Sequence, residues 1–176
     1  MRRITVTLPV LFGIATLAAA PAAFAESSSA GRSVEAMRER AEEIATDYLR
    51  RWSSGNARAL ADVQALYGPR VSFHGDFIDQ RRLFDQKRRF GQRWPIRRYE
   101  HRPGTMRTSC DAARQACLVR SIIDWQAASP ARHAFSSGSS SFEMGIGFSG
   151  PHPAVLFERS RVLSYGGGGR HHAEAW

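Results

Sequence analysis

The sequence predicts an α+β domain in which N-terminal helices pack in the concave face of a curved, mostly antiparallel sheet. Two observations carry this prediction. Apolar residues recur at helical spacing in the first half of the chain, whereas alternation of apolar and polar residues dominates after residue 95. The helices precede the strands and do not alternate with them, which favours separate helical and sheet layers over an alternating α/β fold.

Two helices are expected at the start of the domain. The first begins at Ser33, which is placed to cap it, and its apolar stripe runs to Trp52. Asn56 is placed to cap a second, shorter helix, which the Gly68-Pro69 pair ends.

A short hairpin and a third helix come next. The segment "VSFHGDFID" alternates on either side of Gly75-Asp76, which is typical of a tight hairpin. Asp79 is placed to cap a helix over residues 80–94, and Pro95 ends it.

Four long strands are expected after this helix. They are "RRYEHRPGTMRTSC", "CLVRSIIDWQAAS", "RHAFSSGSSSFEMGIGF" and "AVLFERSRVLS", separated by the cysteine turn, a Ser-Pro turn and a Gly-Pro-His-Pro turn. The alternation of Phe142, Met144, Ile146 and Phe148 indicates that one face of the sheet is buried.

The N-terminus has the pattern of a secretory signal peptide. Two arginines precede the apolar run "ITVTLPVLFGIATLAAA", and Ala23-Phe24-Ala25 matches a small-x-small cleavage pattern. We therefore expect an exported protein, periplasmic or secreted, with the signal in residues 1–25 and cleavage after Ala25. A polar linker over 26–32, one domain over 33–165 and a flexible Gly-rich tail over 166–176 complete the expected organisation, with no stable membrane insertion after cleavage.

Positive charge is concentrated in one segment. The chain carries a formal net charge of +9, and the segment from Arg81 to Arg107 alone contains ten basic residues and two acidic ones, a net of +8. For an exported protein this favours an anionic envelope ligand or a small acidic molecule over a nucleic acid.

The two cysteines, Cys110 and Cys117, enclose the turn-sized segment "DAARQA". An even number of closely spaced cysteines in an oxidising compartment favours a disulfide that closes a hairpin. A metal pair is the alternative, but no second close pair has convincing ligand spacing. We expect no metal and no cofactor.

The third helix separates its arginines from its aromatic residues. On a helical wheel Leu83, Phe90 and Trp94 lie on the side facing the core, and most arginines lie opposite. A platform for single-stranded nucleic acid needs both kinds of side chain on one surface. This pattern therefore predicts an anionic contact face formed by Arg88, Arg89 and Arg93, and no nucleic-acid partner.

Lys87 breaks the pattern, because it lies in the middle of the apolar stripe. A buried ammonium needs a carboxylate partner, a route to solvent or a wet cavity. Two interpretations are open. In the first, the aliphatic stem of Lys87 packs on the core and its ammonium reaches solvent or a structural acid. In the second it is a pocket lysine with a lowered pKa.

Asp124 and Trp125 lie inside an apolar strand, where aspartate is disfavoured. Asp124 is expected either as a general base in a cavity or as the ion-pair partner of Lys87 or Arg120, with the ion pair favoured. A ligand cavity lined by Lys87, Trp94, Tyr99, Asp124 and Trp125 is the resulting hypothesis. Which face of the strand is concave stays open.

The order of elements resembles the nuclear-transport-factor-two-like (SnoaL-like, cystatin-like) superfamily of α+β cones, in which a cavity often opens between helices and sheet. The segments "DQKRRFGQRWPIRRY", "RPGT", "CLVRSIIDW" with "SPAR", and "SSGSSSF" resemble an exported bacterial branch of unassigned activity, also found after caspase-like peptidase domains. The resemblance implies this fold and an extracytoplasmic location.

No catalytic motif of the superfamily's enzymes matches this chain residue by residue. We therefore expect a non-catalytic module that binds a ligand or partner. The alternative is a small cavity enzyme, an isomerase, dehydratase or hydrolase, with acid–base chemistry at Asp124 or Lys87. A homodimer through the sheet is a further expectation.

Overall fold

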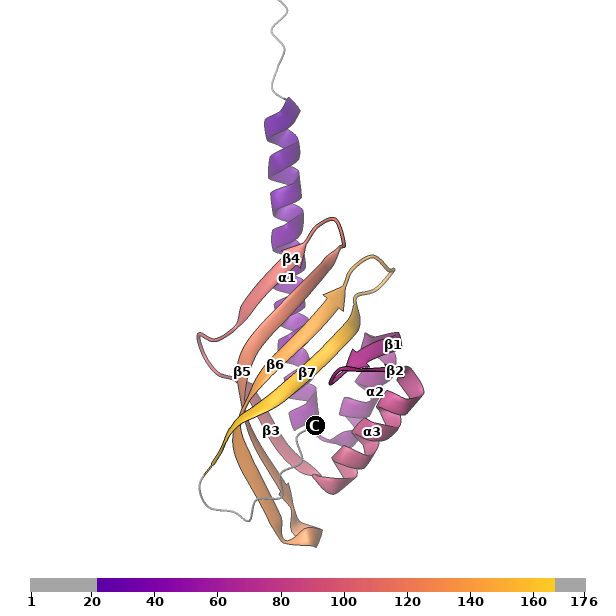
Figure 1. Ribbon diagram of the computed structural model, residues 1–176, viewed down its shortest axis with the longest axis vertical. Coiled ribbons are helices and arrows are strands. Elements are labelled where there is room, and N and C mark those ends of the chain that lie inside the picture. Colours follow the sequence, from indigo (N-terminus) through magenta and orange to yellow (C-terminus); the bar gives the residue numbers. More distant parts are fainter. Residues whose placement is uncertain (1–21, 167–176) are drawn as a thin grey trace, which may run out of the picture.

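The three α-helices come first, interrupted only by one short hairpin, and the remaining strands follow them, so the predicted α+β class is confirmed (Figure 1). The computed structural model describes residues 22–166, with side chains from Ser33 onward. Most of the expected signal peptide and tail lie outside this range. The helices are α1 (Ala22–Ser53), α2 (Asn56–Leu66) and α3 (Gln80–Arg93). The strands are β1 (Tyr67–Phe73), β2 (Asp76–Asp79), β3 (Ile96–His101), β4 (Arg107–Asp111), β5 (Ala116–Ser129), β6 (Ala134–Gly147) and β7 (Ala154–Tyr165), with a short 3₁₀ turn at Pro130–Arg132.

All strands join one curved sheet in the order β2-β1-β7-β6-β5-β3, and β4 pairs with β5 alongside β3. Every pairing is antiparallel except that of β1 with β7, which is parallel. In Figure 1 the sheet lies in front of α1, while α2, α3 and the β1–β2 hairpin gather at one edge. The helices therefore cover one face of the sheet and leave the other uncovered.

The strand expected from residue 97 to Cys110 is split in two. β3 and β4 both pair with β5, and the segment 102–106 between them leaves the sheet. Pro103 has no N–H to donate and Gly104 has a φ of 73°, so "RPGT" cannot continue the ladder. The Thr105 hydroxyl compensates by accepting from Ile122 N at 3.1 Å.

Helix α1 starts earlier than predicted. It begins at Ala22, so Ser33 is an internal residue and not a cap, and residues 26–32 are helical. Residues 22–32 contain no proline and four alanines, so no residue in this stretch prevents the helix from starting at Ala22.

The start of α2 is also corrected, because Gly55 is its N-cap and no side chain caps it. Asn56 instead joins α2 to α3 and β3. Its Nδ2 donates to Gly91 O at 3.1 Å, and its Oδ1 accepts from Arg97 Nη1 at 2.7 Å. A Cβ at Gly91 would lie 2.7 Å from Asn56 Oδ1, so this close approach of the helices requires glycine.

The predicted cap of α3 is confirmed, since Asp79 Oδ1 accepts from Arg82 N at 2.7 Å. The core lies between α1 and the inner face of the sheet, where alternate residues of β5 and β6 are buried. They include Val119, Ile123, Phe142, Met144 and Ile146. The predicted burial of one sheet face is therefore confirmed.

The predicted disulfide is present between Cys110 and Cys117, which face each other across the β4–β5 pair. No helix within residues 22–166 is long and apolar enough to cross a membrane.

Breaking this disulfide should lower the free energy of unfolding. Because the closed loop is short, the chain-entropy model gives a loss of about 2–3 kcal/mol for Cys110→Ala/Cys117→Ala. Urea denaturation with and without dithiothreitol checks this. The wild type should lose stability on reduction, and the double variant should not respond; equal stability of the oxidised wild type and the variant would contradict the prediction.

Candidate functional site

Lys87 is enclosed in the core between α3, α1 and the sheet, with 3% of its surface exposed. Its Nζ lies 3.0 Å from Glu158 Oε2 and 2.7 Å from the Tyr48 hydroxyl. The Phe73 ring centroid lies 4.7 Å from the same nitrogen. Of the two interpretations, the one in which the stem packs on the core and the head reaches a structural acid is therefore correct.

Glu158 completes this buried cluster from β7. Tyr48 donates to its Oε1 at 2.8 Å, and the Tyr67 hydroxyl donates to its Oε2. The carboxylate thus receives two hydroxyl donors and the ammonium, and the four residues come from four different elements, α1, β1, α3 and β7. We call Tyr48, Tyr67, Lys87 and Glu158 the core cluster.

Burial governs the electrostatics of the core cluster. Desolvation lowers the pKa of Lys87, and the charge of Glu158 opposes this effect. Desolvation, followed by the Glu158 charge, raises the pKa of Tyr48 well above its ordinary value, so this hydroxyl stays protonated and keeps donating. An ion pair enclosed in this way stabilises the fold only while both partners are present.

Sequence reasoning missed Glu158, and a β-bulge is the reason. Strict alternation from the buried Val155 would place Phe157 inward and Glu158 outward. Instead Ile146 pairs with Val155 while Gly145 pairs with Phe157, so Leu156 is an extra residue and the side chains after it change face. The position of Lys87 correctly indicated that it needs a carboxylate partner. Strict alternation along β7, however, predicts that the side chain of Glu158 faces solvent.

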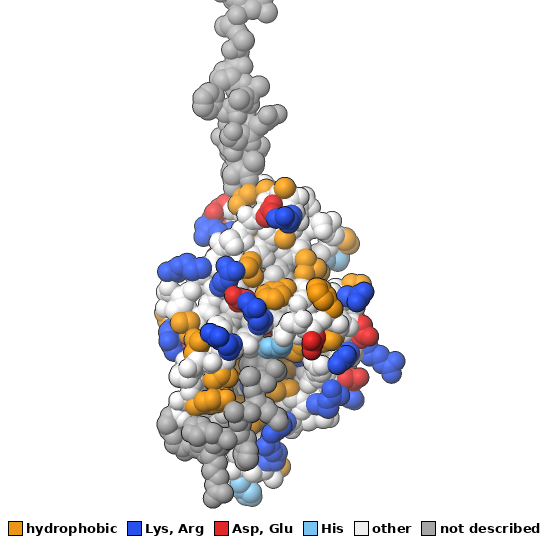
Figure 2. Space-filling view, in the orientation of Figure 1, with side chains coloured by type: hydrophobic (Ala, Val, Ile, Leu, Met, Phe, Trp, Pro, Cys, Tyr) orange, Lys and Arg blue, Asp and Glu red, His pale blue; other side chains and the backbone are white. Residues whose placement is uncertain are grey.

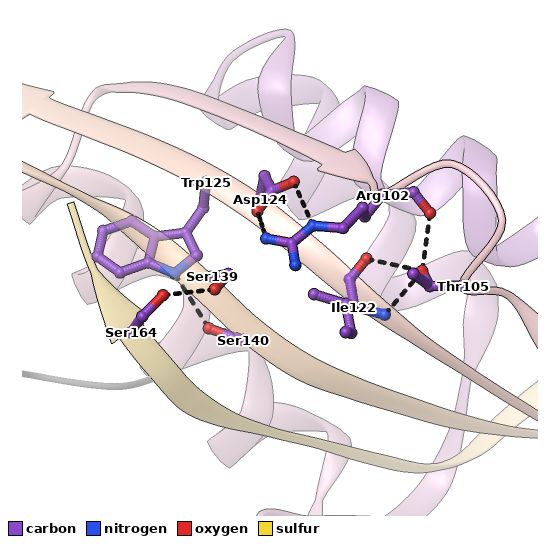
Figure 3. Close-up of polar contacts among 8 residues, drawn as sticks. All are labelled: Arg102, Thr105, Ile122, Asp124, Trp125, Ser139, Ser140 and Ser164. Carbon is purple, nitrogen blue, oxygen red and sulfur yellow. Dashed lines mark hydrogen bonds and ion pairs between the residues drawn. The ribbon is translucent and has the colours of Figure 1, made fainter.

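Asp124 does not meet Lys87. It lies on the outer face of β5, about half exposed, and Arg102 binds it with two hydrogen bonds of 3.1 and 2.6 Å (Figure 3). The Arg102 bond lowers the pKa of the Asp124 carboxyl. Asp124 therefore forms a structural ion pair, as favoured from the sequence, but its partner is Arg102 and not Lys87 or Arg120. Arg120 pairs with Glu143 instead.

The other expected cavity residues are also separated. Tyr99 is buried in the core, and Trp94 is buried at the end of α3 with the Arg132 guanidinium 5.1 Å from its ring centroid. Trp125 projects from the opposite face of β5 to Asp124, and its Nε1 donates to Ser140 Oγ at 3.0 Å (Figure 3). Within the described part of the chain, the five residues Lys87, Trp94, Tyr99, Asp124 and Trp125 therefore do not line one common cavity.

Asp124 and Trp125 do line a common groove of about 360 Å³ at the end of the sheet. Its walls come from β3, β5, β6 and β7. The lining residues are Arg98, Glu100, Arg102, Asp124, Trp125, Gln126, Ser137, Gly138, Ser139, Ser164, Tyr165 and Gly166. We call this the serine groove.

The expected anionic contact face is only partly as predicted. Arg89 is exposed, but Arg88 pairs with Asp85 at 3.0 Å and Arg93 is half-buried near Arg132. Exposed arginines also occur at the start of α3, at Arg81 and Arg82. No group of three or more His, Cys, Asp or Glu side chains that could hold a metal occurs in the described part of the chain.

No protein-family model matches the sequence, and no curated protein is significantly similar to it. Solved structures are similar in fold. A proposed scytalone dehydratase from Novosphingobium aromaticivorans has a TM-score of 0.58 at 11% identity, over 86% of this chain and 94% of its own. An uncharacterised protein with a cystatin-like fold from Caulobacter vibrioides has a TM-score of 0.54 at 11% identity, over 79% and 91%.

A third structure, the Kfla4162 protein from Kribbella flavida, has a TM-score of 0.55 at 6% identity, over 80% of this chain and 95% of its own. Identities this low show the fold alone. The fold is that of the cystatin-like α+β cones, as the order of elements in the sequence indicates.

Removing one partner of the buried ion pair should destabilise the domain strongly. Lys87→Met leaves a buried carboxylate without its cation and should cost about 3–5 kcal/mol of unfolding free energy. Adding Glu158→Met in the same chain should recover part of this loss. Urea denaturation gives the free energy of unfolding of all three proteins. The matched control is Arg40→Gln/Glu43→Gln, which removes an exposed ion pair and should change this free energy by less than about 1 kcal/mol. Unchanged stability of Lys87→Met would contradict the buried pair.

Stability should also fall in mild acid. Burial lowers the pKa of both His74 and His101 in the folded protein. Below about pH 6.5 the unfolded chain binds protons that the folded chain resists, so the free energy of unfolding falls as the pH drops toward the lowered pKa values. Urea midpoints in this range should depend less on pH in His74→Asn/His101→Asn, because asparagine does not titrate and tolerates the left-handed backbone of residue 74. Equal pH dependence in both proteins would show that these histidines are not the cause.

Proposed function

We propose that the chain is a non-catalytic binding module that acts outside the cytoplasm and holds a small, neutral, hydrogen-bonding ligand in the serine groove. The observation that carries this proposal is the contrast between a closed interior and a charge-balanced groove on the surface. The cystatin-like cone supports the same class of function, because its helices and sheet form a scaffold on which small ligands can bind.

The closed interior argues against acid–base catalysis in the core. A general acid or base must reach its substrate within hydrogen-bonding distance. Lys87 and Glu158 are 3% and 4% exposed and already bind each other and two tyrosines. Asp124, the other candidate base, lies on the opposite face of the sheet and is occupied by Arg102. The alternative of a cavity enzyme that uses Asp124 or Lys87 therefore has no geometric support.

The serine groove offers ordered hydrogen-bonding groups on four neighbouring strands. Glu100 pairs with Asp124, Asp124 with Ser139, and Ser139 with Ser164, which makes one polar row across the outer face. Since neighbouring strands lie about 4.8 Å apart, such a row presents donors and acceptors at regular spacing. The Oγ atoms of Ser139 and Ser164 lie 2.7 Å apart.

The charges in the groove indicate a neutral ligand. Arg98 pairs with Glu100 and Arg102 pairs with Asp124, so the two cations and the two anions are balanced. Arg98 donates only to Oε1 of Glu100, and each oxygen of Asp124 accepts a single bond from Arg102, so both carboxylates can accept from a further donor. The volume of about 360 Å³ lies at the small end of the range for ligand pockets. A hydroxyl-rich molecule such as a sugar unit matches this combination of size and polarity.

Location outside the cytoplasm rests on two supports. The expected signal peptide directs export, and the Cys110–Cys117 disulfide is typical of proteins in oxidising compartments. The expected homodimer through the sheet remains a separate proposal. It would cover the outer face and with it part of the serine groove, so sedimentation with and without ligand distinguishes the two.

Neutral saccharides should bind in the serine groove. We expect titration of the ¹⁵N-labelled protein with glucose, N-acetylglucosamine and their disaccharides to shift the amide signals of β5, β6 and β7 at the groove. Asp124→Asn and Ser139→Ala should each weaken the affinity about tenfold, as expected for a lost hydrogen bond at a charged or enclosed group. Glu143→Gln, which alters an arginine-bound carboxylate of the same sheet face outside the groove, is the control and should bind as the wild type does.

Two outcomes would contradict this proposal. One is the absence of shifts with every neutral saccharide. The other is a set of shifts that surrounds Lys87 and Tyr48, because that would place the ligand in the interior.

A further inference from the structure

Phe77 is the most exposed large hydrophobic side chain of the described residues, at 75%. It lies on β2, where its neighbour Ile78 points into the core, so alternation directs Phe77 outward. The turn of the hairpin is made by His74 and Gly75, both with positive φ, so Phe77 has no role in the turn. The fold therefore gives no reason for an aromatic residue at this position.

Several arginines lie near Phe77 along the chain and in the register of the hairpin. Helix α3 begins at Gln80, directly after β2, and Arg81 and Arg82 lie in its first turn. Arg70 lies opposite Asp79 in the β1–β2 strand register and, like Phe77, is exposed. Arg89 follows two turns along α3. Figure 2 shows Lys and Arg side chains, with acidic side chains among them, along the side of the molecule where Figure 1 places α3.

Among the described residues these arginines form no ion pair, although the carboxylate of Asp79 caps α3 next to them. No ion pair joins Arg70, Arg81, Arg82 or Arg89 to an acidic side chain within the part of the chain whose side chains are described. On α1, by contrast, Arg38, Arg40 and Arg50 each pair with a glutamate or aspartate three residues away. Arg107 and Arg161 on the outer face of the sheet are likewise exposed and without an ion pair among the described residues, so the exposed Phe77 beside the arginines is what distinguishes this surface.

Two of the arginines also occupy an unfavourable position in their helix. The first turn of a helix carries a partial positive charge, which favours acidic residues there. Helix α3 has none in its first turn and has Arg81 and Arg82 instead. Asp79 caps this end of the helix, and an external anion would add to its effect by offsetting the repulsion between the arginines.

We infer that the surface formed by Arg70, Phe77, Arg81, Arg82 and Arg89 binds an anionic lipid bilayer. Arginines near a bilayer are attracted by acidic headgroups, and an exposed phenylalanine enters the boundary between headgroups and acyl chains. Phe77 decides between a bilayer and a soluble anionic polymer, because only the bilayer offers an apolar phase next to the anions. We call these five residues the lipid-binding surface.

This surface is separate from the serine groove and independent of the proposed ligand. It also changes the position of the expected anionic contact face. The face moves from Arg88, Arg89 and Arg93 toward the start of α3 and the hairpin, since Arg88 is paired with Asp85 and Arg93 is half-buried.

Vesicle co-sedimentation tests the inference with the chain that begins at Glu26. All core residues lie at or after Met37, so this chain keeps the whole core and lacks the apolar N-terminal segment. We expect it to bind vesicles of phosphatidylcholine with phosphatidylglycerol and not vesicles of phosphatidylcholine alone. Arg81→Gln/Arg82→Gln should reduce the partition coefficient about 25-fold, since each arginine near an anionic surface contributes about fivefold. Phe77→Ser should reduce it about tenfold.

Matched variants control for net charge and for exposed aromatic area. Arg107→Gln/Arg161→Gln removes the same charge from the outer face of the sheet, and Phe135→Ser removes another phenylalanine that is 50% exposed. Both should bind as the parent chain does. Phe77→Trp should shift its added fluorescence to shorter wavelength with the anionic vesicles, because the ring leaves water.

Three results would overturn the inference. They are the absence of binding to phosphatidylglycerol vesicles, an equal loss of binding in Arg107→Gln/Arg161→Gln, and full binding by Phe77→Ser. The last result would mean that the arginines bind anions without insertion into a bilayer.

Discussion

The ion pair of Lys87 and Glu158 is the interaction on which the rest of this domain depends. An ammonium and a carboxylate in a nearly dry interior must be close to each other, so the elements that carry them, α3 and β7, have little freedom to shift. The hydroxyls of Tyr48 and Tyr67 extend this constraint to α1 and β1. Four elements far apart in sequence are thereby held at one point, and the helices and the sheet meet around it.

This constraint decides where the domain can interact with other molecules. The interior is occupied by its own charges and rings, which leaves the surface for ligands and partners. Two surfaces differ in their electrostatics. The serine groove has paired charges and suits a neutral molecule, whereas the lipid-binding surface has unpaired arginines beside an exposed ring. The two proposed binding surfaces share no residue, so occupation of one does not block the other.

Much of the fold could be predicted from the sequence because local signals determined it. The Asp79 cap, the hairpin around Gly75 and the alternation in β5 and β6 each reside in a few neighbouring residues. The position of Lys87 in an apolar stripe also predicted that its stem is buried, but it left open whether the ammonium reaches solvent, an acid or a pocket. Its partner was not predictable, because the extra residue at Leu156 turns Glu158 inward and a bulge leaves no mark in a pattern of alternation. The prediction that Asp124 lines a cavity with Lys87 was wrong for a different reason. Alternation shows that the side chains of a strand point to two opposite faces, but the packing of the helices decides which of these faces is buried.

Lys87 has one more consequence, which concerns the chemistry of the whole chain. It is the only lysine in the sequence. Every ε-amine of the protein is therefore engaged in the interior with Glu158 and Tyr48. Acylation, methylation or conjugation at a lysine would require the core to open first. The surface, rich in guanidinium groups and without a single ε-amine, keeps its positive charge under conditions that modify lysine-bearing proteins.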